Sequence, residues 1–115
     1  MSKHDPEITF RQMLEYSEEV LSLVDGKTKN DIEEGRVLNL ALVRLLEMIG
    51  EAANRIPDPI QDKYPEFPWL QVIGLRNRLI HGYDSIDYDI LWIILTRDIP
   101  LLIQQLHSIL NQENL

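Results

Sequence analysis

The chain has 115 residues, of which 44% are hydrophobic, contains no cysteine and carries a net charge of −8 at pH 7. These values predict one globular domain over residues 1–115 and disfavour a protein that binds nucleic acid across a broad basic face. Without cysteine there can be no disulfide, and the N-terminus shows no apolar signal region, so a cytoplasmic protein is expected. The apolar runs are also too short to predict a membrane span.

The first half of the chain predicts two long helices. Asp5, followed by Pro6, is a typical helix start, and the Asp-Gly pair at residues 25–26 is a typical stop. A second helix is predicted from residue 30 or 31 to about Arg55, with a bend near Gly35.

Two more helices are predicted after a proline-rich stretch. Residues 60–63 suit one short turn, and Pro68 opens a helix that Gly82 is suited to end. The last helix is expected to begin after residues 85–87, to run to about Asn111 and to kink at Pro100. The predicted fold class is therefore all-α, an up-and-down bundle of four main helices plus a short helical turn.

The second helix has an unusually wide apolar arc. Its first stripe consists of Leu38, Leu42, Leu45, Ile49, Ala52 and Ile56, and its second of Val37, Leu40, Ala41 and Met48. A helix that is apolar over such an arc is expected to be buried on two sides. Gly50 disfavours the helix by about 1 kcal/mol relative to Ala, so it predicts close packing against a neighbouring helix.

Residues 76–83 read Arg-Asn-Arg-Leu-Ile-His-Gly-Tyr and are the most informative segment. If residues 69–82 form one helix, Arg76 falls near the middle of an apolar face and Arg78 on the opposite side. Asn77 and His81, four residues apart, would then lie together at the rim of that face. A polar site on an apolar wall is therefore predicted, made of Arg76, Asn77, His81 and Tyr83.

The charge distribution supports this site. No acidic residue occurs between Glu66 and Asp84, so the compact cationic segment of an acidic chain coincides with the motif. A small cationic site suits an encounter with one phosphate better than tracking along a strand.

The motif resembles the signature of the HEPN ribonucleases, and its full Arg-x4-His-x-Tyr form resembles the HepT-type toxins. Residues 49–53 (Ile-Gly-Glu-Ala-Ala) are similar to the family's second helix, and residues 87–92 and 98–102 to its last helix. The resemblance covers roughly residues 5 to 112. It implies a HEPN-like fold, ribonuclease activity at a dimer cleft, and pairing with a small nucleotidyltransferase antitoxin.

Each motif residue has two interpretations. Arg76 either pairs with Glu51, Asp84 or Asp87, or holds a phosphate by two parallel hydrogen bonds. His81 either interacts with the end of the helix dipole or acts as general acid and base on a ribose 2′-hydroxyl and a leaving 5′-oxygen. The resemblance favours the catalytic role for both residues.

The neighbouring residues have supporting roles in this hypothesis. Asn77 is expected to orient His81 or to cap a neighbouring group, and Arg78 is expected to be a solvated charge that could touch RNA. The resemblance implies that Tyr83 is the residue to which the antitoxin attaches AMP. Trp69 and Trp92 are expected to be core anchors.

No metal site and no cofactor are predicted. Glu47 and Glu51 are four residues apart on one helix, but no His accompanies them at ligand spacing. Glu51 is instead a candidate for a salt bridge across an interface.

Cleaving RNA without a metal requires a base, an acid and cations near the phosphorus, whereas one motif supplies one His and one Arg. Two motifs across a two-fold axis would complete the set, so a homodimer is expected. The first hypothesis is a toxin that is a metal-independent endoribonuclease, with RNA as substrate and a nucleotidyltransferase antitoxin as partner. The second hypothesis is a non-catalytic helical module that binds a nucleotidyltransferase or a nucleotide.

Overall fold

A computed structural model describes residues 5–82 and 85–113. Its elements, in chain order, are α1 (Pro6–Val24), α2 (Lys29–Glu34), α3 (Arg36–Arg55), α4 (Asp58–Lys63), α5 (Trp69–Ile73), α6 (Leu75–Leu79), β1 (Ile80–His81), β2 (Ser85–Ile86), α7 (Tyr88–Ile93), the π-helical segment η1 (Ile94–Asp98) and α8 (Ile99–Glu113). The fold is all-α apart from a two-residue antiparallel pairing of β1 with β2.

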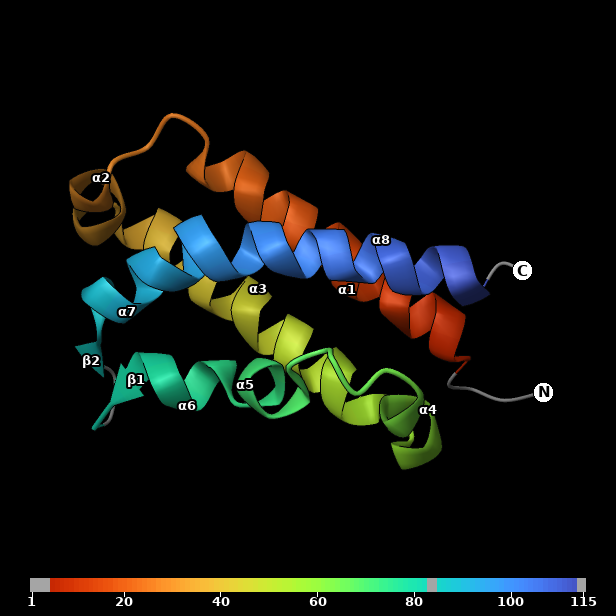
Figure 1. Cartoon of the computed structure of the whole chain (residues 1–115). Coiled ribbons are helices and arrows are strands. Elements are labelled where there is room, and N and C mark those ends of the chain that lie inside the picture. The colour runs from red at the N-terminus through yellow and green to blue at the C-terminus, as the bar shows by residue number, and fades with distance from the viewer. Residues whose placement is uncertain (1–4, 83–84, 114–115) are drawn as a thin grey trace.

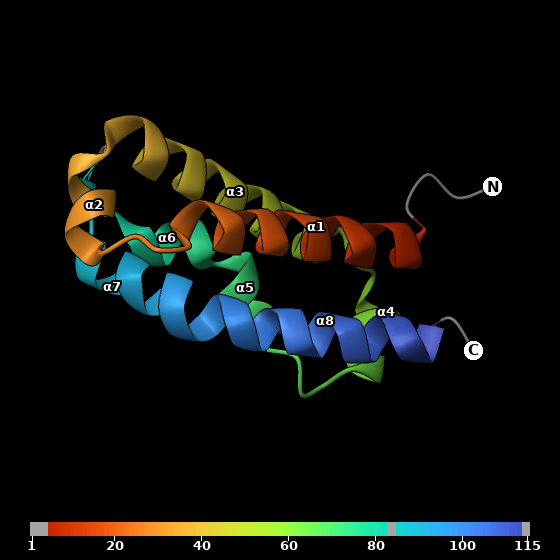
Figure 2. The ribbon, with the colours of Figure 1, turned by 90° about the horizontal axis from the view of Figure 1, so that it is seen from above.

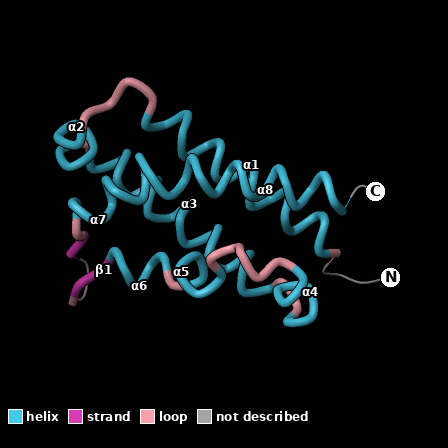
Figure 3. The backbone as a smooth tube through the Cα atoms, in the orientation of Figure 1, coloured by secondary structure: helices cyan, strands magenta, loops and turns pink. Residues whose placement is uncertain are grey.

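The helices form four legs of a bundle (Figures 1 and 2). The legs are α1, α3, the pair α5–α6, and the run α7–η1–α8, while α4 is a short turn beside the end of α3. α1 packs against both α3 and α8, and α3 also packs against α5 and α6. The predicted bundle of four main helices and a short turn is confirmed. The small strands lie at the end of the bundle opposite the start of α1 and the end of α8 (Figure 3).

The core runs along the inside of all four legs. At the α4 end it contains an aromatic cluster, in which the ring of Phe10 contacts Tyr64 edge-on and Trp69 at a tilt. Trp69 is buried and donates its indole N–H to the backbone carbonyl of Tyr64 at 3.0 Å, which confirms its expected role as an anchor. Trp92 is only partly buried, although it packs against the same core.

Gly35 breaks the predicted second helix into two. Thr28 and Asp31 form a reciprocal capping box that starts α2 one or two residues earlier than expected. Asn39 then donates from its side chain to the carbonyl of Ile32 at 3.2 Å, which ties the end of α2 to α3. The expected bend is therefore a full break, followed by a helix that ends at Arg55 as predicted.

Gly50 lies where α5 crosses α3, as predicted from its position inside a helix. A Cβ at this position would lie 2.9 Å from the carbonyl oxygen of Val72 and 3.1 Å from that of Ile73. Only a glycine lets the backbone of α5 approach α3 this closely. The distance between α3 and the α5–α6 leg therefore depends on residue 50 being a glycine, which has no side chain.

The prediction of one helix over residues 69–82 is wrong. The helix breaks at Gly74, resumes as α6 and ends at Leu79, after which Ile80 is extended with φ −102° and ψ 123°. Ile80 is β-branched and pairs with Ile86, so the chain turns back toward α7 instead of completing another helical turn. Gly82, with φ +65°, serves the connection between the strands and does not cap the helix.

The last leg contains the π-helical segment η1 directly before Ile99 and Pro100, near the position where a kink was predicted. Proline lacks the N–H that an α-helix needs at this position, and a wider turn accommodates the change in hydrogen bonding. The carboxylate of Asp87 caps α7 by accepting the backbone N–H of Ile90 at 3.0 Å. Over the described part of the chain, no helix has both the length and the apolar character needed to span a bilayer.

Candidate active site

Arg76 lies on α6 with its side chain 56% exposed, and its Nε donates to Oε2 of Glu47 on α3 at 2.6 Å. The expectation that Arg76 lies in the middle of an apolar face is wrong. Because the helix is interrupted at Gly74, Leu75 and Leu79 are the α6 residues that face the core. The sequence suggested Glu51, Asp84 or Asp87 as the partner of this arginine, whereas the observed partner is Glu47.

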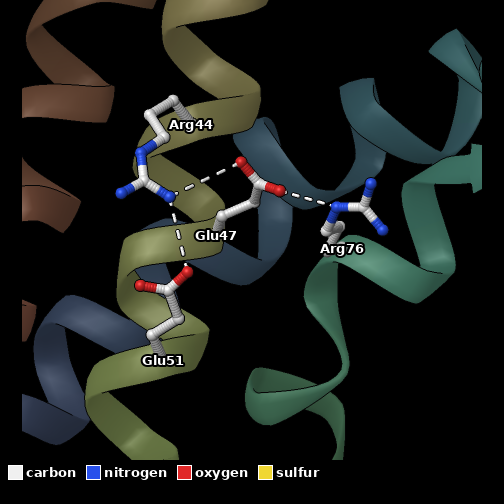
Figure 4. A network of polar contacts seen from close by, with 4 residues as sticks. All are labelled: Arg44, Glu47, Glu51 and Arg76. Carbon is white, nitrogen blue, oxygen red and sulfur yellow. Dashed lines mark hydrogen bonds and ion pairs between the residues drawn. The ribbon is translucent and has the colours of Figure 1, made fainter. Parts of the chain in front are cut away.

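Glu47 belongs to a network of four charged residues (Figure 4). Its Oε1 lies 3.8 Å from Nη1 of Arg44, and the same nitrogen donates to Oε1 of Glu51 at 3.4 Å. The side chain of Glu47 is 23% exposed, whereas the other three are more than half exposed. Glu47 is therefore the most firmly packed member. In Figure 4 the two terminal nitrogens of Arg76 point away from Glu47.

A shallow hollow of about 220 Å³ lies between α3 and the α5–α6 leg, beside this network. Arg76 and Asn77 from α6 and Gly50 from α3 are among the residues that line it. The lining residues are Leu46, Glu47, Gly50, Glu51, Asn54, Ile73, Arg76 and Asn77. Polar and apolar residues both line the hollow, and the guanidinium of Arg76 lies there beside the carboxylates of Glu47 and Glu51.

His81 lies on β1 with its side chain 62% exposed, and its Nε2 is 3.3 Å from Oδ2 of Asp87. The predicted stacking of Asn77 on His81 along a helix is wrong, because the helix ends at Leu79 and His81 is extended. Asn77 lies in the hollow beside Arg76 instead. The partner that orients His81 among the described residues is Asp87.

Asp87 makes two contacts with its carboxylate. One oxygen caps α7 and the other receives His81, so the imidazole is held against the start of a helix. The pKa of Asp87 is lowered from its ordinary value, first because the carboxylate accepts the backbone N–H of Ile90 and then because His81 hydrogen-bonds to it. Asp87 therefore remains an anion that can hold a protonated imidazole.

Arg78 is less solvated than expected. Its side chain is 34% exposed and donates to Asp98 of η1 at 3.3 Å, and Arg97 shares the same carboxylate at 3.1 Å. Its contacts are thus with the last leg, whereas those of Arg76 are with α3. Tyr83 lies outside the described residues.

Sequence reasoning did not identify Glu47 as the partner of Arg76, and it considered Asp87 as a partner for Arg76 and not for His81. A signal for Glu47 was present, because it precedes Gly50 by three residues and so shares the helix face that meets α5. Within the described residues, no three His, Asp or Glu side chains come together as a metal site would require.

These features define a small all-α domain that presents an arginine and a histidine at its surface, each held by a carboxylate from another element. Residues 13–109 match the family model described as ribonuclease HepT-like. The chain therefore belongs to the HepT-like ribonuclease family, and the predicted family and fold class are confirmed.

Several proteins are similar to this chain over most of their length. One from Methanocaldococcus jannaschii, provisionally named an RNase, is 37% identical over 100 residues, which cover 87% of this chain and 92% of that protein. A protein from Caldanaerobacter subterraneus, also provisionally named an RNase, is 34% identical over a stretch that covers 94% of this chain and 96% of that protein. A protein of Thermococcus cleftensis, named a probable ribonuclease HepT, is 33% identical over a stretch that covers 80% of this chain and 87% of that protein. No solved structure matches the chain.

Proposed function

We propose that this protein is a metal-independent endoribonuclease that acts as the toxin of a toxin–antitoxin pair. The observation that carries the proposal is that Arg76 and His81 are both more than half exposed, each paired with one carboxylate. Ion pairs of this exposure stabilise a fold by about 0–1 kcal/mol at most. Stability therefore does not explain an Arg-x4-His segment, whereas phosphate binding and proton transfer do.

The proposed reaction is attack of a ribose 2′-hydroxyl on the adjacent phosphorus. The imidazole of one His81 takes the 2′-hydroxyl proton, the new P–O2′ bond forms, and the P–O5′ bond breaks. A second, protonated His81 donates its proton to the leaving 5′-oxygen, so the products are a 2′,3′-cyclic phosphate and a 5′-hydroxyl. Arg76 stabilises the charge on the phosphorane through its terminal N–H groups.

This reaction needs two copies of the motif, and we place them in a homodimer. The apolar stripe of α3 supports this proposal, because Val37 is 83% and Leu40 48% exposed in the single chain. Arg44 lies one turn after Leu40 on the same helix. A dimer formed on this face would bring the network of Glu47 and Arg76 near the two-fold axis.

We also propose that a nucleotidyltransferase partner silences the enzyme by attaching AMP to Tyr83. The motif position of Tyr83, two residues after His81, supports this proposal because an added nucleotide would compete with RNA for the same cations. Incubation with the partner and ATP, followed by mass spectrometry, is expected to find AMP on Tyr83 and none on a Tyr83→Phe protein. An adduct at another residue would contradict this role.

The decisive experiment for the proposed function is RNA cleavage by the purified protein in EDTA. We expect cleavage to persist in EDTA and to be lost in Arg76→Ala and His81→Ala. Arg55→Ala and His107→Ala, two exposed residues away from the motif, serve as matched controls and are expected to cleave normally. Loss of cleavage in EDTA that Mg²⁺ restores would refute the acid–base mechanism. An inactive wild-type protein would favour the second hypothesis, a non-catalytic module.

A further inference from the structure

The contact between Glu47 and Arg76 has a specific geometry. Glu47 accepts from Nε of Arg76 at 2.6 Å, and both terminal nitrogens point away from the carboxylate (Figure 4). A guanidinium has two edges that can bind an oxyanion in a bidentate way, one with Nε and one with only the terminal nitrogens. Glu47 occupies the first edge and leaves the second one facing outward.

The two partners differ in how firmly they are held. Arg76 is exposed on α6, a helix of five residues, and has a long flexible side chain. Glu47 is mostly covered and lies in the middle of α3, a helix of twenty residues that packs on α1, α5 and α6. The close approach at Gly50, three residues further on, sets the separation of the two helices at this point. The rigid element therefore carries the carboxylate, and the arginine is the group that it orients.

We propose that Glu47 is a positioning residue, which holds Arg76 through Nε so that the terminal edge of the guanidinium meets the scissile phosphate. This inference rests on the proposed function. Glu47 does not touch the substrate, and its negative charge weakens the attraction of Arg76 for a phosphate in the ground state. It raises the rate because the guanidinium is already oriented when the phosphorane forms.

This role predicts that kcat falls without any rise in KM for RNA. In Glu47→Ala, Arg76 is free to rotate, and kcat is expected to fall roughly tenfold, since misplaced charge stabilises the transition state poorly. KM for RNA is expected to stay constant or to fall, because a negative charge has been removed beside the phosphate. A residue that served only stability would lower the amount of folded enzyme and leave KM and kcat per folded molecule unchanged.

Two further variants make the test specific. Glu47→Gln keeps an oxygen that accepts from Nε, so it is expected to retain most of kcat with a lower KM. Glu51→Ala removes a neighbouring carboxylate that contacts Arg44 and not Arg76, and it is expected to lower kcat less than Glu47→Ala does. Thermal unfolding of each variant reports the folded fraction.

Each outcome separates this inference from the proposed function. A wild-type protein that does not cleave RNA would refute the proposed function, and the role of Glu47 with it. An active wild type beside a Glu47→Ala protein with unchanged or increased kcat would refute only the positioning role. Equal losses in Glu47→Ala and Glu51→Ala would assign the effect to the whole charged network and would also overturn the inference.

Discussion

At the scale of single residues, the motif is a set of exposed side chains whose neighbours are acidic. Arg76 is held by Glu47, and His81 by Asp87. In each pair the acid comes from a different element from the base, so the two local geometries depend on how α3 and α7 pack. The residue types were evident from the sequence, whereas these partners were not.

Removing either motif side chain is expected to leave the fold intact. Arg76→Ala and His81→Ala lose only exposed ion pairs, so each should change the free energy of unfolding by no more than about 0.5–1 kcal/mol. Leu79→Ala, between them in the chain and fully buried, is the contrasting control and should lose about 2–5 kcal/mol. Urea unfolding followed by circular dichroism measures all three. A motif variant that unfolds as readily as Leu79→Ala would show that its side chain is structural.

Asp87 makes a further, pH-dependent contribution to stability. Its folded pKa is below the ordinary value of 3.8, so its contribution is present above that pH and is lost as the pH falls through the folded pKa. Asp87→Asn keeps a capping side chain but loses the charge. The variant should therefore unfold at lower urea than wild type at pH 6, and the gap should close as the pH falls below 3.8 and through the folded pKa of Asp87. A gap that is the same at every pH would contradict this account.

At the scale of elements, the site depends on how closely α5 approaches α3. Gly50→Ala adds a Cβ that would lie 2.9 Å from a backbone oxygen of Val72, which has no flexible end to move aside. Alanine favours the helix by about 1 kcal/mol, but overpacking typically costs 1–3 kcal/mol and here forces two backbones apart. We expect a net loss of roughly 0–2 kcal/mol on this balance, measured by urea unfolding.

The same substitution should also weaken cleavage, since it separates Glu47 on α3 from Arg76 on α6. Asn54→Ala, one turn further along α3 and exposed, is the matched control for stability and should change it by less than about 0.5 kcal/mol. A Gly50→Ala protein that is more stable than wild type would show that the two helices move apart at little cost.

At the scale of the whole molecule, the proposed homodimer predicts that two copies pair through the exposed apolar face of α3. We expect sedimentation to show a dimer at micromolar concentration, and the double variant Val37→Glu with Leu40→Glu to be monomeric and inactive. Both side chains are exposed, so the monomer should remain folded. Leu70→Glu is the control, because Leu70 is 84% exposed on α5. A monomeric wild type would contradict the dimer, and a dimer broken only by Leu70→Glu would move the interface to α5.

The sequence by itself determined the elements whose signals are local. Helix starts and stops depend on capping residues, prolines and apolar spacing within a few positions, so α1, the end of α3 and the start of α7 were predicted to within a few residues. An irregularity at Gly35, the packing at Gly50 and the family were evident for the same reason, since each depends on residue types at fixed spacing, although Gly35 was expected to bend the helix and not to break it.

Only the tertiary structure decided where the motif side chains go. The helical pattern of residues 69–82 was strong enough to predict one continuous helix, but the packing of α5 on Gly50 and the pairing of Ile80 with Ile86 interrupt it. Each helical residue turns the side chain by about 100°, so a break at Gly74 and an end at Leu79 redirect every later side chain. Arg76 thereby meets Glu47, and His81 meets Asp87, because those contacts depend on distant elements that no local pattern encodes.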